Sequence, residues 1–118
     1  MENHDHISNQ FDNDLESIRN HVLSMGGLVE ANVKNAITSL LERDEALAED
    51  VATADFKVNK MEVEIDEECT QIIAKRQPAA GDLRLVVTAI KVITDLERIG
   101  DEAEKIGRYA QTLASKKA

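Results

Sequence analysis

The sequence has 118 residues, 42% hydrophobic and 31% charged, which suits a single folded domain. Its formal net charge of −9 argues against nucleic-acid binding and against attraction to an anionic membrane surface, because both need basic residues. Cys69 is the single cysteine, which excludes an internal disulfide. The first residues are too polar for a signal peptide, and no stretch approaches the roughly 18 apolar residues that span a bilayer. We therefore predict a cytoplasmic protein without membrane insertion.

Hydrophobic spacing predicts a first helix over residues 9–42, after a polar N-terminal tail over residues 1–8. The apolar residues recur at steps of three and four: Leu15, Ile18, Val22, Met25, Val29, Ala36 and Leu40. Gly26 and Gly27 interrupt this helix, at a cost of about 1 kcal/mol each relative to alanine. Either the helix relaxes at the two glycines or another helix approaches closely there.

A second helix is predicted over residues 44–76. Its apolar row contains Leu47, Val51, Ala54, Val58, Met61, Ile65 and Ile72. Cys69 lies close to this row and is interpreted as a small buried hydrophobic residue. The only proline, Pro78, ends the helix because it disfavours helical geometry at the preceding residue.

The third helix, over residues 79–116, has the most regular pattern. One predicted core row repeats every seven residues: Leu85, Val92, Ile99, Ile106 and Leu113. A companion row consists of Ala89, Leu96, Ala103 and Ala110. Three predicted helices make the fold class all-α. Because short connections make consecutive helices antiparallel, the predicted architecture is an elongated antiparallel three-helix bundle.

A second ordered face is predicted on the third helix, away from the Leu85 row. It begins with Val86, Val87, Ile90 and Ile93 and continues with Glu97, Asp101, Glu104 and Arg108. A lone bundle does not require this apolar segment, so we expect another bundle, a second copy or a partner protein to cover it.

Glu97 and Asp101 are one helical turn apart and about 40° apart around the axis. Two carboxylates at this spacing suit a hard cation, although acidic pairs are also common on solvated faces. The pattern leaves both interpretations open. Asp55 and Asn59 are predicted to lie at about the same level on the second helix, where they are either auxiliary ligands or solvated.

Two motifs in this region resemble those of the PhoU family of bacterial phosphate-signalling proteins. One is the turn Gln77-Pro78-Ala79-Ala80-Gly81-Asp82-Leu83-Arg84. The other is Asp95-Leu96-Glu97-Arg98-Ile99-Gly100-Asp101, which contains the family's pair of acids separated by three residues. The resemblance extends from about Phe11 to Tyr109.

The resemblance implies a cytoplasmic regulator of phosphate uptake that represses phosphate-starvation genes, the Pho regulon. The implied partners are the ATPase subunit of the phosphate ABC transporter and a phosphate-sensing histidine kinase. The implied cofactors are metal ions, with Glu97 and Asp101 as ligands and Asp95 beside them. Carboxylate chemistry favours magnesium, calcium or manganese, whereas iron and zinc enter only through the family.

The family has two tandem repeats, whereas this chain has one. It therefore resembles an N-terminal half, or it pairs with itself as a homo-oligomer. No Glu-x-x-His pair, glycine-rich phosphate loop or catalytic triad is present, so we predict no enzymatic activity. The alternative function is a structural oligomerisation or adaptor bundle without a metal role.

Overall fold

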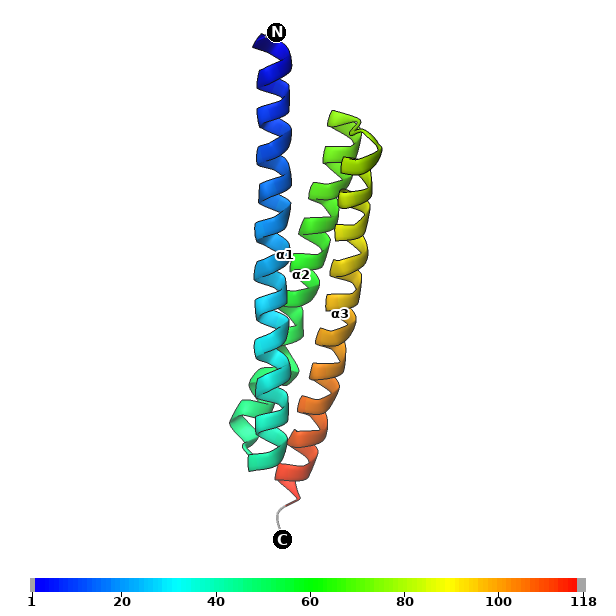
Figure 1. Cartoon of the computed structure of the whole chain (residues 1–118). Coiled ribbons are helices and arrows are strands. Elements are labelled where there is room, and N and C mark those ends of the chain that lie inside the picture. Colours follow the sequence, from blue (N-terminus) through cyan, green and yellow to red (C-terminus); the bar gives the residue numbers. More distant parts are fainter. Residues whose placement is uncertain (1, 117–118) are drawn as a thin grey trace.

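A computed structural model describes the backbone of residues 2–116 and the side chains of residues 9–116. These residues form three helices, α1 (Glu2–Glu42), α2 (Glu45–Arg76) and α3 (Ala80–Ser115). The helices pack along one another into a rod of 73 × 18 × 18 Å, with α2 antiparallel to α1 and α3 (Figure 1). The predicted all-α, elongated three-helix bundle is confirmed.

The first helix is longer than the apolar pattern indicated. α1 begins at Glu2, so residues 2–8 are helical and are not an irregular tail. The prediction was based on the first residues suited to an N-cap, but residues 2–8 contain no glycine or proline that would stop a helix from continuing. As a result, the first turns of α1 extend past the turn between α2 and α3 (Figure 1).

The two connections are short. Asp44 caps α2 by accepting a hydrogen bond from the backbone N–H of Leu47 at 3.0 Å. Arg43 and Gln77, which follow α1 and α2, both adopt positive φ angles, 51° and 44°. This left-handed conformation ends each helix and reverses the chain direction.

The core has two parts. The large-residue core consists of Ile18, Met25, Val29, Val58, Ile65, Cys69, Ile72, Val86 and Ile93. The small-residue core consists of Ala36, Val51 and Ala103, with Val33 and Ile106 packed against it. Cys69 is fully buried as a free thiol, as predicted.

The buried face of α3 differs from the prediction by one residue. The buried row is Val86, Ile93, Gly100, Gly107 and Ala114, again at intervals of seven. The predicted core residues Leu85, Val92, Ile99 and Leu113 are instead 38–56% exposed. The predicted companion row does face the core, because Ala103 and Ala110 are buried and Ala89 and Leu96 are partly buried.

Close packing of α2 against α3 explains this shift. A Cβ atom at Gly107 would lie 2.9 Å from Cγ1 of Val51, and one at Gly100 would lie 3.1 Å from Cγ1 of Val58. Both glycines therefore occupy core positions where a side chain would displace residues of α2. The face expected to need an external cover, with Val86 and Ile93, is already covered by the bundle.

Polar contacts join α1 to α2 beside the large-residue core. Glu68 accepts a hydrogen bond from Ser17 at 2.9 Å and contacts Nδ1 of His21 at 3.0 Å. Arg76 donates to Asp14 at 3.0 Å. Among residues 2–116, no helix is both long and apolar enough to cross a membrane.

Candidate metal centre

Carboxylates gather where Gly100 of α3 packs against α2. Asp55 occupies a core position of α2, in the buried row that includes Val51 and Val58, and is only 7% exposed. Gly100 faces it from α3, and a Cβ atom there would lie 3.2 Å from Oδ1 of Asp55. The absence of a side chain at residue 100 thus leaves space beside a buried carboxylate.

Asp55 is poorly compensated for a buried acid. Its Oδ2 accepts one hydrogen bond from the side-chain amide of Asn59 at 3.3 Å. Its Oδ1 is buried and has no hydrogen-bond partner among the described residues. Burying an anionic oxygen without a partner is costly, so this position favours either a proton or a cation.

Asp101 and Glu104 of α3 complete a cluster with Asp55. Each of the three carboxyl groups offers an oxygen atom, and these oxygens lie within 4.8 Å of one another. Glu104 is held by Arg108, which donates to Oε1 at 2.9 Å and 2.8 Å. Lys105 lies 3.6 Å from Asp101. The cationic side chains therefore approach the two acids of α3 from the outside.

The acid-base properties of the cluster follow from this arrangement. Burial, with a further contribution from the Glu104 and Glu97 carboxylates, raises the pKa of Asp55 to about 6. The pKa of Glu104 is lowered, chiefly by its hydrogen bonds with Arg108. At neutral pH the cluster therefore carries like charges at close range, and a bound cation would reduce their repulsion.

The residues fit a hard divalent cation. All three candidate ligands are carboxylates, the ligand type that magnesium and manganese prefer, and the unpartnered Oδ1 of Asp55 could act as a ligand without losing a hydrogen bond. When bound, the cation would supply positive charge between α2 and α3. The three side chains would hold it and orient it against the helix pair.

The five predicted site residues have different positions. Asp101 and Asp55 belong to the cluster, and Asn59 supports it through its hydrogen bond to Asp55. Glu97 lies outside the three-carboxylate cluster, although its charge adds to the burial that raises the pKa of both Asp55 and Glu62. Asp95 has a side chain 72% exposed and lies 4.0 Å from Arg98, so it faces solvent.

Glu104 was not selected as a ligand from the sequence. It lies seven residues after Glu97 and three after Asp101, so the helical spacing of the acidic row already included it. The sequence places Asp55 at this level but does not show that its carboxyl group is buried. The sequence pattern placed Ala54 in the apolar row of α2, whereas Asp55 takes the core position facing α3.

The histidine and the cysteine whose side chains the structure describes lie apart from this cluster. His21 contacts Glu68 between α1 and α2. The thiol of Cys69 is buried, and burial raises its pKa to about 11, which keeps it protonated at neutral pH. The cluster is therefore a site of oxygen ligands alone.

Residues 22–110 match the family model of the PhoU domain. The chain belongs to the PhoU family. The family prediction made from the turn and acidic motifs is thus confirmed.

Curated PhoU proteins are similar in sequence to this chain. It is 60% identical over 105 residues to the phosphate-specific transport system accessory protein PhoU of Serratia marcescens, covering 89% of this chain and 43% of the relative. The Escherichia coli (strain K12) protein of the same name is 56% identical over 105 residues, covering 89% and 44%. These relatives are named as accessory proteins, which agrees with the prediction of a non-enzymatic protein.

A crystal structure of PhoU from Pseudomonas aeruginosa has the same fold. It superposes with a TM-score of 0.87 at 50% identity, covering 90% of this chain and 51% of that chain. The chain thus spans about half the length of the PhoU proteins that it matches.

Proposed function

We propose that this chain is a cytoplasmic regulator of phosphate uptake and phosphate-starvation signalling. In this proposal it negatively regulates the Pho regulon by coupling the ATPase subunit of the phosphate ABC transporter to a phosphate-sensing histidine kinase. The observation that carries the proposal is the 56–60% identity, over 89% of the chain, to phosphate-specific transport system accessory proteins. Similarity this high over almost the whole chain supports a shared role.

The acidic cluster contributes a metal site to this proposed function. Asp55, Asp101 and Glu104 would hold one divalent cation, which would offset most of their combined negative charge and stabilise the pairing of α2 with α3. The oxygen-only ligand set favours magnesium or manganese over iron or zinc. Glu97 and Asp95 would then contribute negative potential around the site, not direct ligands.

The proposal also includes self-association. The chain matches about half of each relative, and apolar side chains of α3 remain exposed. A homo-oligomer would therefore bring together two three-helix units.

Partner binding tests the regulatory role. The purified chain is mixed separately with the transporter's ATPase subunit and with the cytoplasmic part of the phosphate-sensing kinase from the same bacterium, and binding is measured by interferometry. We expect a saturable interaction with at least one of them. If neither binds, the proposed coupling is rejected for this chain.

Metal binding is tested by calorimetry with manganese and magnesium and by elemental analysis. The double substitution Asp101→Asn with Glu104→Gln should weaken binding at least about tenfold, since two of three ligands lose their charge. Glu64→Gln with Glu67→Gln is the matched control, because both acids are exposed on α2 outside the cluster. Equal metal content in all three proteins would contradict the metal site.

The alternative of a structural oligomerisation bundle without a metal role makes the opposite prediction. The exposed apolar residues of α3 favour an association surface of some kind. If that is the whole function, the Asp101→Asn, Glu104→Gln protein keeps its oligomeric state and its partner binding unchanged.

A further inference from the structure

Two cationic side chains of α3 already contact the candidate metal centre. Arg108 donates from Nε and Nη2 to the same oxygen of Glu104, Oε1, at 2.9 Å and 2.8 Å. The Nζ atom of Lys105 lies 3.6 Å from Oδ2 of Asp101. Two of the three candidate ligands therefore have a counter-ion that comes from their own helix.

The third candidate ligand, Asp55 of α2, is in a different situation. It accepts a hydrogen bond from the neutral amide of Asn59, and its buried Oδ1 has no partner among the described residues. The pKa of Glu104, in contrast, is lowered chiefly by its hydrogen bonds with Arg108, which keep that carboxyl group anionic without a metal ion. The cluster therefore has opposing properties: Asp55 favours the entry of a cation, whereas the side chains on α3 oppose it.

The effect of Arg108 on metal binding has two possible signs. A side chain that holds a ligand in place strengthens metal binding, whereas a positive charge beside the site weakens it. The side chain of Arg108 is 63% exposed and that of Glu104 only 20%, so packing already restrains Glu104 while Arg108 is free to move. Repulsion between charges does not require a fixed geometry, and we therefore expect it to dominate.

We propose that Arg108 and Lys105 are competing counter-ions that lower the affinity of the cluster for a divalent cation. The inference rests on the metal site proposed above and concerns the regulation of that site. Lys105 has a second partner, Glu102 at 3.3 Å, so it can leave Asp101 without losing its ion pairs. A site weakened in this way exchanges its ion readily, and its occupancy follows the concentration of the free cation.

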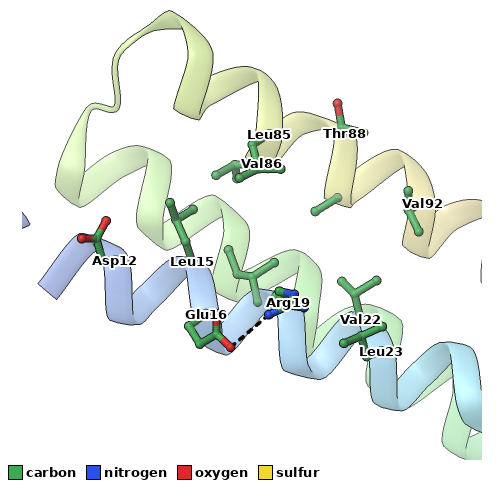
Figure 2. A pocket seen from close by; sticks show the side chains of 12 residues that line it. Asp12, Leu15, Glu16, Arg19, Val22, Leu23, Leu85, Val86, Thr88 and Val92 are labelled. Carbon is green, nitrogen blue, oxygen red and sulfur yellow. Dashed lines mark hydrogen bonds and ion pairs between the residues drawn. The ribbon is translucent and has the colours of Figure 1, made fainter. Parts of the chain in front are cut away.

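An ion pair elsewhere in the chain provides the matched control. Glu16 and Arg19 of α1 pair at 3.4 Å beside an apolar groove between α1 and α3. Figure 2 shows this pair next to Leu15 and Val22, which point toward α3. Both charged side chains are more than half exposed and lie outside the carboxylate cluster. Arg19→Gln therefore removes one positive charge from the chain without changing the candidate site.

Calorimetric titration with manganese, after removal of bound metal with a chelator, tests the proposal. Arg108→Gln should bind manganese about tenfold more tightly than the wild type, and Lys105→Gln about threefold more tightly, because each loses a nearby positive charge. Arg19→Gln should stay within about twofold of the wild type. Circular dichroism verifies that each variant remains helical.

A conservative variant separates charge from geometry. Arg108→Lys keeps the positive charge but loses the paired hydrogen bonds of the guanidinium group. If charge is the cause, its manganese affinity should remain within about threefold of the wild type.

A magnesium titration followed by NMR gives a second readout, on the wild-type chain itself. The Nε–Hε signal of Arg108 should shift as magnesium is added, because its carboxylate partner changes. The corresponding signal of Arg19 should not move.

The outcomes distinguish this inference from the metal site on which it rests. If neither the wild type nor the Arg108→Gln and Lys105→Gln variants bind manganese, the metal site and the competition are both overturned, while the partner-binding assay still tests regulation. If the wild type binds manganese and Arg108→Gln binds it equally well or more weakly, the competition alone is overturned. Tighter binding by both variants, but not by Arg19→Gln, supports the proposal.

Discussion

The two parts of the core achieve burial in different ways. The large-residue core fills the space among the helices with Met25, Ile65, Val86 and Ile93, and beside it a groove between α1 and α3 remains open. In the small-residue core, Ala36 and Ala103 are joined by Gly107, which allows α2 and α3 to pack closely. Bulky side chains separate helices, whereas small ones bring their backbones together.

This difference in helix spacing also explains the position of the candidate metal centre. Asp55, Asp101 and Glu104 come within reach of one another where Gly100 begins the closely packed stretch of α2 and α3. Carboxylates on widely spaced helices would not share a cation. Close packing and ligand convergence therefore have the same cause, a glycine at a core position.

The largest expected effect is the loss of a bulky side chain from the large-residue core. Ile93→Ala should lower the free energy of unfolding by about 3 kcal/mol, because Ile93 is 1% exposed and its removal leaves a cavity. Phe56→Ala, at a position 73% exposed, should change it by no more than about 0.5 kcal/mol. Urea unfolding of both variants provides the measurement, and equal losses would contradict the assignment of Ile93 to the core.

A smaller effect is expected from adding a methyl group to the small-residue core. Gly107→Ala should destabilise the chain by about 2 kcal/mol, because the new Cβ would lie 2.9 Å from Val51 and 3.2 Å from the backbone N of Ala52. The matched change Gly27→Ala enters open space and should stabilise α1 by up to about 1 kcal/mol. Thermal unfolding at low protein concentration compares the stability of the two variants. A stabilising Gly107→Ala would show that α2 and α3 are not closely packed.

The smallest effect concerns Asp55 and depends on pH. Its folded-state pKa of about 6 exceeds the ordinary value of 3.8, so the folded state binds the proton more tightly. Protonation of Asp55 therefore stabilises the folded state at low pH. This stabilisation is lost as pH rises through 6, and the loss is at most about 3 kcal/mol for a pKa difference of about two units. Asp55→Asn should gain about 1–2 kcal/mol near pH 7.5, less than this maximum because its amide leaves an imperfect hydrogen-bond pattern.

The gain should shrink near pH 5, where Asp55 is already protonated in the folded state. Urea unfolding at both pH values, in the presence of a chelator, tests this sign. Glu64→Gln is the control, because Glu64 is an exposed acid of α2 outside the cluster, and it should change the free energy of unfolding by no more than about 0.5 kcal/mol at either pH. A gain for Asp55→Asn that is larger at pH 5 than at pH 7.5 would contradict the assignment of a raised pKa.

Secondary structure and fold class could be predicted from the sequence because they depend on local signals. Apolar residues at steps of three and four, the break at Arg43 and Asp44, and the proline at residue 78 were sufficient for three helices in an antiparallel bundle. The turn and acidic motifs were sufficient for the family. Cys69 was correctly assigned to the interior from its place near an apolar row.

Only the tertiary structure decided which face of α3 is buried and that Asp55 of α2 lies in the interior, whereas most of the predicted core residues of α1 and α2 are buried. The sequence pattern favoured the bulky Leu85 and Ile99 as core residues over Gly100 and Gly107. Hydrophobic periodicity depends on apolar side chains alone and does not indicate where two helix backbones approach closely. For the same reason Ala54 appeared to be a core residue and Asp55 a peripheral one. The packing of α2 against α3 reverses these assignments, buries Asp55 beside Asp101 and Glu104, and leaves the Leu85 row exposed. A one-residue rotation of a helix costs little in local pattern, so the choice between neighbouring faces depends on how well all three helices fit together.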